Sequence, residues 1–161
     1  MRPGEAILIV SYTFPPYKGI GGRRWAKFAK ALAQRGHPVH VIHSAGAEEL
    51  KGSLWNADVV HPDIHTHPLP QRYPTVLFKR PLTTVAEKVM YRVWSRVLPM
   101  ITRGNWLDKS VRWRTPFLAK CSELIQAHGI RNVVVTGAPF GLMAHACALR
   151  ARFPELNLVA D

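Results

Sequence analysis

Cysteine is nearly absent from this sequence, and acidic residues are scarce. Only Cys121 and Cys147 occur, both within apolar patterns of helical period. We expect them to be small buried hydrophobic residues in a reducing compartment, with a disulfide as the less favoured alternative. The 10 acidic residues stand against 22 lysines and arginines, a formal net charge of +12. Such a field attracts polyanions, phosphorylated ligands or an anionic membrane surface, and it does not distinguish among them.

Long hydrophobic runs and internal repeats are also missing. Without a stretch of about twenty apolar residues, no transmembrane helix is predicted. The apolar run near the N-terminus is too short for an export signal, so we expect a cytoplasmic protein. Hydrophobic residues make up 47% of the 161 residues, which suffices for one compact domain with a sizeable core and disfavours disorder.

Apolar strands alternate with amphipathic helices along the chain. Strands are expected over residues 6–10, 39–43, 64–69, 132–136 and 156–160. Helices are expected from Arg23 to a cap at Gly36, over 83–98, from Thr115 to Gly129, and over 140–153. The alternation predicts an α/β fold, a Rossmann-like doubly wound parallel sheet in a single domain.

Particular residues support the helix predictions. The apolar stripe of the first helix consists of Trp25, Phe28, Ala29 and Leu32. In the next helix, we expect Pro99 to end or kink the chain. Thr115, followed by a proline, is expected to be the N-cap of the third helix.

A glycine-rich loop follows the first strand. Gly19, Gly21 and Gly22 would let backbone N–H groups approach an anion, beside the positive end of the next helix. Arg23 and Arg24 lie at the start of the helix, where the helix dipole disfavours cations. Binding of an anion there would explain their presence. A dinucleotide fingerprint fits poorly, because Arg24 takes the place of its last glycine. The glycines therefore indicate either a phosphate site or simply a tight turn.

Four segments resemble the opening half of family 4 glycosyltransferases, which are retaining enzymes of the GT-B fold. They are Ile-Leu-Ile-Val-Ser-Tyr-Thr-Phe-Pro-Pro with Gly-Ile-Gly-Gly-Arg-Arg (7–24), Leu-Ala-Gln-Arg-Gly-His-Pro-Val-His-Val (32–41), Val-Thr-Gly-Ala-Pro-Phe (135–140) and Leu-Val-Ala-Asp (158–161). Together they cover roughly half of the chain, and the middle of the chain resembles nothing that we can name.

The resemblance implies a domain organisation and an activity. Residues 1–161 would form the N-terminal acceptor-binding domain, and the C-terminal donor-binding domain would be absent from this chain. The whole protein would move a sugar from a nucleotide-sugar to a glycan or lipid-linked acceptor, in surface polysaccharide or glycoconjugate synthesis. We expect no metal ion and no other cofactor, and we expect this chain alone to be inactive.

The resemblance also implies a set of site residues. Those expected at the donor phosphates or in the acceptor cleft are Gly19, Gly21, Gly22, Arg23, Arg24, Thr136, Gly137, Pro139 and Phe140. Arg24 and Asp161 are the candidates for a catalytic role, Arg24 because it would neutralise the departing nucleotide.

The helix over 83–98 has an apolar stripe and a basic side. Lys88, Arg92 and Arg96 supply the charge, and Trp94 lies near them. Either the stripe packs on the core and the basic side is solvated, or the exposed stripe and its cations contact anionic lipid. The second alternative would make the protein peripheral on the inner face of the membrane.

Other interpretations compete with these. His61, His65 and His67 lie near Asp58 and Asp63, but the spacing matches no recognised metal site, and we expect none. The main alternative function is a basic polyanion-binding module without catalysis, at a nucleic acid or a membrane surface. Because no nucleic-acid motif is recognisable, we expect no nucleic-acid partner. A nicotinamide-dependent enzyme, an interaction domain without chemistry, and self-association through exposed cleft surface stay open.

Overall fold

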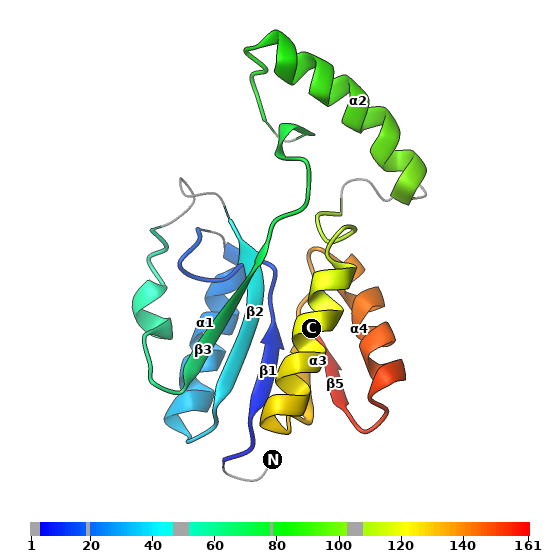
Figure 1. The fold of residues 1–161 in the computed structure, drawn as a ribbon. Coiled ribbons are helices and arrows are strands. Elements are labelled where there is room, and N and C mark those ends of the chain that lie inside the picture. The colour runs from blue at the N-terminus through cyan, green and yellow to red at the C-terminus, as the bar shows by residue number, and fades with distance from the viewer. Residues whose placement is uncertain (1–3, 19, 47–51, 78, 103–107) are drawn as a thin grey trace.

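The structure is a computed structural model, and it describes residues 4–18, 20–46, 52–77, 79–102 and 108–161. Five parallel strands form one sheet in the order β3-β2-β1-β4-β5 (Figure 1). The strands are β1 (Ile7–Val10), β2 (Val39–Ala45), β3 (Ile64–Pro70), β4 (Asn132–Val135) and β5 (Asn157–Ala160). All five predicted strands are confirmed, with ends that differ by at most two residues. The predicted Rossmann-like α/β class is therefore correct.

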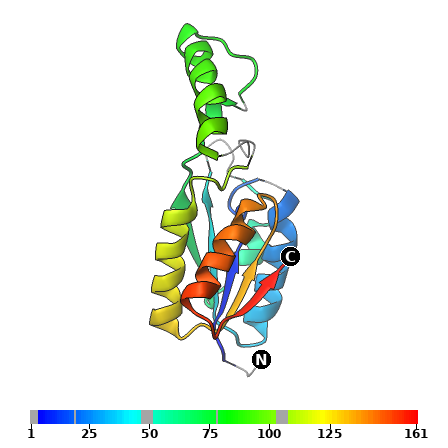
Figure 2. The ribbon, with the colours of Figure 1, turned by 90° about the vertical axis from the view of Figure 1, so that its right-hand side faces the viewer.

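In the described part of the chain, four α-helices accompany the sheet. They are α1 (Ile20–Gln34), α2 (Val85–Thr102), α3 (Arg114–His128) and α4 (Gly141–Arg152), with short 3₁₀ helices η2 (Asn56–Val59) and η3 (Thr75–Leu77). The sheet lies between two helical layers, α1 on one face and α3 with α4 on the other (Figure 2). Side chains that alternate along β1 divide between them: Ile7 and Ile9 pack toward α1, and Leu8 and Val10 toward α3 and α4.

Two predicted helix starts are wrong. Helix α1 begins at Ile20, so Gly21 and Gly22 lie in its first turn and not in the loop before it. Helix α3 begins at Arg114, so Thr115 is inside the helix and is not its N-cap. The buried Trp113 occupies the N-cap position, which means that tertiary packing overrides the capping preference of threonine there.

The packing of two helices also corrects the sequence patterns. On α1 the buried side chains are Ala26, Ala29 and Ala33, whereas Phe28 is 49% exposed. Small alanines let this helix lie close to the sheet, which rotates the larger side chains outward. On α4, Cys147 is exposed, so the prediction that both cysteines are buried is wrong for that residue. Cys121 is buried on α3, burial raises the pKa of its thiol, and both thiols are free.

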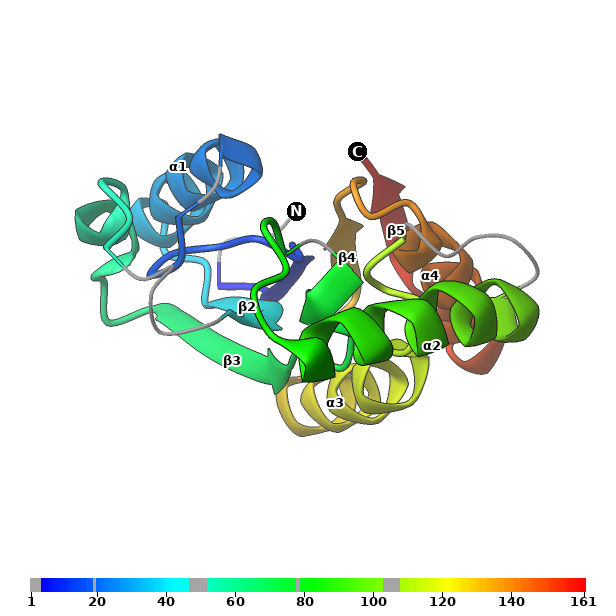
Figure 3. The same cartoon turned by 90° about the horizontal axis from the view of Figure 1, so that it is seen from above.

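Helix α2 stands apart from the sheet, beyond the carboxyl ends of the strands (Figures 1 and 3). It continues through Pro99 to Thr102, so the expected end at Pro99 is wrong. The proline removes one amide donor, and the Thr102 hydroxyl donates to the Leu98 carbonyl at 2.8 Å in the last turn. Leu98 is the one buried residue of this helix. Val89, Met90, Val93 and Val97 are exposed, so the described residues do not cover most of the stripe that one alternative packs on the core.

Candidate functional site

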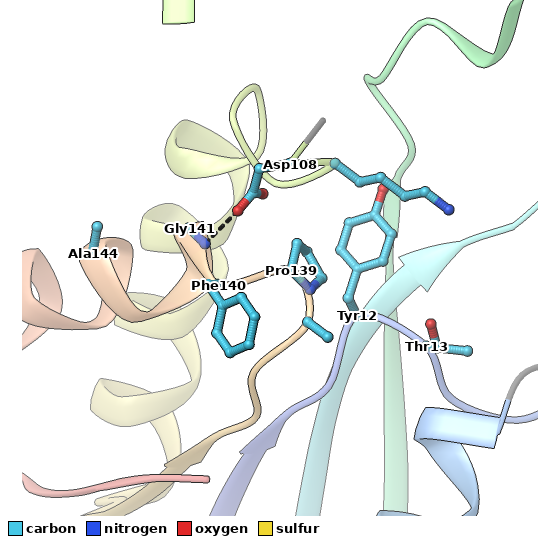
Figure 4. Close-up of a pocket in the computed structure, with 9 residues that line it drawn as sticks. Tyr12, Thr13, Asp108, Pro139, Phe140, Gly141 and Ala144 are labelled. Atoms are coloured by element: carbon cyan, nitrogen blue, oxygen red, sulfur yellow. Dashed lines mark hydrogen bonds between the residues drawn. The ribbon is translucent and has the colours of Figure 1, made fainter. Parts of the chain in front are cut away.

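A pocket of about 680 Å³ opens at the carboxyl ends of β1 and β4. The chain leaves β1 toward β2 and β3 on one side and returns through β4 and β5 on the other, so this is the topological switch point of the sheet. Ligands of open α/β sheets bind at such points. The lining residues are Tyr12, Thr13, Asp108, Lys109, Ala138, Pro139, Phe140, Gly141 and Ala144 (Figure 4).

One wall of the pocket is the segment that follows β1. Tyr12 is buried, with its ring centroid 5.0 Å from that of Trp113, and burial raises the pKa of its hydroxyl. The Ser11 hydroxyl donates to the Thr13 carbonyl at 2.9 Å and fixes the turn that follows the strand. This wall therefore presents an aromatic ring to the pocket from a rigid backbone.

The opposite wall is the loop between β4 and α4. Ala138 has a φ of 51°, a left-handed conformation that costs an alanine about 1–2 kcal/mol. Strain of this kind persists where the surrounding structure enforces it, and it gathers at functional sites. Pro139 and Phe140 follow, and the Phe140 side chain is 74% exposed. A ligand in the pocket would meet an apolar rim on this side.

Asp108 fixes the start of helix α4. Its carboxylate accepts hydrogen bonds from the Gly141 N–H at 2.6 Å, the Ser110 N–H at 2.8 Å and the Ser110 hydroxyl at 2.5 Å. A Cβ at Gly141 would lie 2.5 Å from the Ser110 hydroxyl and 2.9 Å from the Asp108 carboxylate, so a side chain there would displace these groups. The positive end of α4 is thus neutralised by a carboxylate of the protein itself. Asp108 is a positioning residue of this pocket.

The two described glycines at the start of α1 differ in their surroundings. A Cβ at Gly22 would lie 2.7 Å from the Thr13 carbonyl oxygen, so this glycine lets the helix pack against the loop after β1. Gly21 is exposed, and a Cβ there would meet nothing within 4 Å. The first N–H groups of a helix have no partner within the helix and can bind an anion. Gly19 lies outside the described residues.

Arg23 and Arg24 diverge from one another. The Arg24 guanidinium forms an ion pair with the Asp161 carboxylate, which also accepts a hydrogen bond from Trp25 Nε1 at 3.0 Å. The Arg23 guanidinium lies 4.2 Å from the ring centroid of Trp55. The structure therefore brings together the two residues expected to have catalytic roles, and it directs Arg23 elsewhere.

The expected cleft residues of the β4–α4 loop also separate. Pro139 and Phe140 line the pocket, whereas Thr136 and Gly137 do not. Thr136 is buried and its N–H donates to the Val10 carbonyl at 2.9 Å; the Gly137 N–H donates to the Asp161 carbonyl at 2.6 Å. These two hydrogen bonds continue the pattern of the sheet past the end of β4 and anchor the beginning of the β4–α4 loop. They are not among the residues that line this pocket, and their expected place in the acceptor cleft stays a prediction.

Several pocket residues were not among the predicted site residues, namely Tyr12, Thr13, Asp108, Lys109, Ala138, Gly141 and Ala144. Tyr12 and Thr13 directly follow the first strand, a position that would have identified them. Asp108 carries no such signal, because its role depends on how the chain returns to α4.

Histidines gather on another part of the sheet. His40 on β2 lies beside His65 and His67 on β3 and His128 at the end of α3, with ring centroids 4.1 to 5.4 Å from its own. Burial, followed by the charges of these neighbours, lowers the pKa of His40 to about 4. His61 is not in this cluster. Within the described residues, no group of His, Cys, Asp or Glu side chains is arranged to hold a metal ion.

The four residues expected at a membrane lie on α2 but not on one face. Lys88, Arg92 and Arg96 are exposed. Trp94 is half-buried and packs toward Tyr73, Leu77 and Leu98, so it does not share their surface.

Comparison with known proteins supports the assignment of the fold. No family model and no curated protein sequence matches the chain. Among solved structures, the chain is similar to the glycosyltransferase UGT2 of Phytolacca americana, solved in complex with UDP-2-fluoro-glucose and pterostilbene. The two share 13% sequence identity and a TM-score of 0.56, over 99% of this chain and 30% of UGT2. The C-terminal domain of a hydrogenase from Pyrococcus furiosus matches at 16% identity over 100% of this chain and 93% of its own, but its TM-score of 0.48 carries no argument.

The chain has the Rossmann-like fold of one half of a GT-B glycosyltransferase. It spans less than a third of the length of UGT2, and at this identity the likeness concerns the fold alone. It does not single out family 4 among GT-B enzymes.

Proposed function

We propose that this chain is the acceptor-binding half of a retaining glycosyltransferase resembling family 4, which moves a sugar from a nucleotide-sugar to a glycan or lipid-linked acceptor. The observation that carries the proposal is the pocket between the ends of β1 and β4. It lies at the switch point of a sheet whose fold is that of a GT-B half. The proposed role of the whole protein is in surface polysaccharide or glycoconjugate synthesis.

The pocket suits an acceptor with an apolar face. Tyr12 stands on one wall and Phe140 on the other, and aromatic rings pack well against the C–H face of a sugar or an apolar carrier. Its strained β4–α4 loop and the Asp108 cap of α4 hold the second wall in place before any ligand binds. Such preorganisation lowers the cost of orienting an acceptor.

The start of α1 suits the phosphates of the donor. Gly21 presents the first turn of the helix without a side chain, and Arg24 lies one turn further along. The Arg24 side chain is 61% exposed in its pair with Asp161, so it remains accessible to a diphosphate. In the proposed mechanism this guanidinium stabilises the negative charge that develops as the nucleotide departs.

Nucleotide release by the natural protein tests the proposal. The protein is incubated with UDP-glucose or GDP-mannose and a panel of glycan and lipid-linked acceptors, and the freed nucleoside diphosphate is measured. Release that requires an acceptor supports the proposal. The absence of turnover across the panel, with a folded protein, contradicts it.

Matched variants locate the chemistry. Arg24→Gln is expected to lower kcat/KM by about 10- to 100-fold, since it removes a charge at the donor phosphates. Arg23→Gln should retain activity, because Arg23 stacks on Trp55. Equal losses in the two variants would show that Arg24 has no special role.

A further inference from the structure

Helix α2 divides into three sectors around its axis. Tyr91, Trp94 and Leu98 face inward and pack on Tyr73 and Leu77. This cluster packs the helix against η3 and fixes its rotation about its own axis. The orientation of the remaining residues is therefore fixed by packing and does not depend on a ligand.

A second side of the helix, next to this cluster, is apolar and open to solvent. We call it the outer face, and it consists of Val85, Val89, Met90, Val93, Val97, Met100 and Ile101. Their side chains are between 37% and 80% exposed. A continuous apolar surface of this kind on a projecting helix marks an interaction site.

Cations border the outer face along one edge. Lys88, Arg92 and Arg96 recur every four residues, so they form a row along the helix. The one acidic residue of α2, Glu87, lies apart from this row and pairs with Lys79. Within the described part of the chain, no carboxylate pairs with Arg92 or Arg96.

The charge favours one kind of partner. A second copy of the chain would bring another +12 charge and another row of cations to the contact. Like charges repel at an interface, whereas an anionic bilayer offers both apolar depth and negative headgroups. Among the described residues, no helix has the length and hydropathy that crossing a bilayer requires, so the contact would be at the surface.

We infer that the outer face of α2 docks on an anionic membrane surface. The valines and methionines enter the apolar part of the interface, and Lys88, Arg92 and Arg96 meet the headgroups. Because α2 stands beyond the same edge of the sheet as the pocket, docking brings that edge toward the bilayer (Figure 1). The inference rests on α2 alone and is independent of the proposed transferase activity.

Vesicle binding tests the inference with two matched double variants. The 161-residue chain is sedimented with vesicles of phosphatidylcholine, or of phosphatidylcholine with phosphatidylglycerol. We expect binding to the anionic vesicles that weakens as salt is raised. Arg92→Gln with Arg96→Gln should weaken it by roughly 10- to 30-fold, because each cation at an anionic surface contributes roughly fivefold.

The control for charge is Arg35→Gln with Arg131→Gln, which removes two exposed arginines away from α2. This control is expected to change binding by less than about threefold. An equal loss in both double variants would overturn the inference in favour of non-specific attraction by net charge.

The control for apolar contact is Val89→Gln with Val93→Gln, which leaves the charge unchanged. It should weaken binding roughly tenfold, since two valine side chains no longer enter the apolar interface. Unchanged vesicle binding would overturn the inference and indicate a simple polyanion site, which a nucleic acid would fit equally well. Self-association that these two substitutions abolish, without vesicle binding, would overturn it in favour of a second copy.

Discussion

The central sheet and helix α2 lie at opposite extremes of burial. All four residues of β1 are buried, whereas α2 buries Leu98 alone among its 18 residues. Both segments are rich in apolar side chains at regular spacing. The difference shows that a regular apolar pattern identifies an element and its face, but not whether that face is covered. Coverage depends on what else the chain places nearby.

This contrast predicts that the sheet and helix α2 have different roles, one in stability and the other in binding. The free energy of folding should depend mainly on the two layers packed on the sheet. The outer face of α2 should contribute little to stability and be available for binding. Substitutions that compare the two regions test this division.

The largest effect is expected from Trp113→Ala. Trp113 is 1% exposed and packs on Tyr12 and Phe117, and its indole N–H donates to the Pro70 carbonyl at 3.3 Å. The free energy of unfolding should fall by about 3–5 kcal/mol, measured by urea denaturation. Trp94→Ala on α2 is the matched control and should cost about 1–2 kcal/mol, because Trp94 is only half-buried. Equal losses of unfolding free energy in the two variants would contradict the contrast between the sheet and α2. If Trp113→Ala does not fold, Trp113→Leu replaces it in the comparison.

Acidification should destabilise the sheet through His40. Its folded pKa is about 4 against an ordinary 6.5, so between these values the unfolded chain binds a proton that the folded chain does not. Stability is then complete above about pH 6.5 and falls as the pH approaches 4, by up to about 3 kcal/mol. Chemical denaturation at a series of pH values measures this loss.

His40→Gln is the control, because it removes the titrating group. The loss of stability on acidification should become smaller, with a remainder from His67 and His43, whose pKa values burial also lowers. The other groups facing this site are His65 and His128, with Lys120 and Glu123 near His67. An identical pH dependence in the variant would show that His40 is not the origin of the effect.

Two adjacent glycines should differ by about 1–3 kcal/mol. Gly22→Ala places a Cβ against the Thr13 backbone, so it should lower the free energy of unfolding by that amount. Gly21→Ala meets open space and should change stability by less than about 1 kcal/mol, in the direction of higher helix propensity. Thermal melts of the pair measure the difference. Equal destabilisation would mean that α1 does not approach the loop after β1 as closely as described.

The smallest effect is expected on the outer face of α2. Val93→Gln should change the free energy of unfolding by less than about 0.5 kcal/mol, because the side chain is already half-exposed. The same urea measurement used for the tryptophan variants applies. A loss above about 1 kcal/mol would mean that the valine is covered within the folded chain.

The sequence predicted the body of the fold well and the site less well. Strand β1 was located because it carries a continuous apolar run, and burial on both faces requires a run of this kind. Strand β3 has no such run, and most residues of β3 and β5 are not buried. Pro139 and Phe140 were placed at the site through a family resemblance. Tyr12 and Asp108 were missed, since the pocket depends on which loops the topology brings together.

The errors have physical causes. Thr115 has the preference of an N-cap, but the burial of Trp113 starts the helix earlier. Phe28 completes an apolar stripe in the sequence, yet the alanines of α1 take the buried positions. The stripe of α2 is present as predicted, and its exposure became evident only from the position of the helix. In each case tertiary contacts decided between locally reasonable alternatives.

The most direct test of the central claim is an NMR titration of the chain with a short-chain alkyl glycoside and, separately, with UDP-glucose. We predict that the glycoside shifts the resonances of Tyr12, Phe140 and Ala144 and binds more tightly than the nucleotide-sugar. Phe140→Ala should weaken glycoside binding by about tenfold, whereas Val159→Ala, which shortens another exposed side chain away from the pocket, should not. Shifts confined to other residues, or tight binding of UDP-glucose without any response to the glycoside, would contradict the assignment of this pocket to an acceptor.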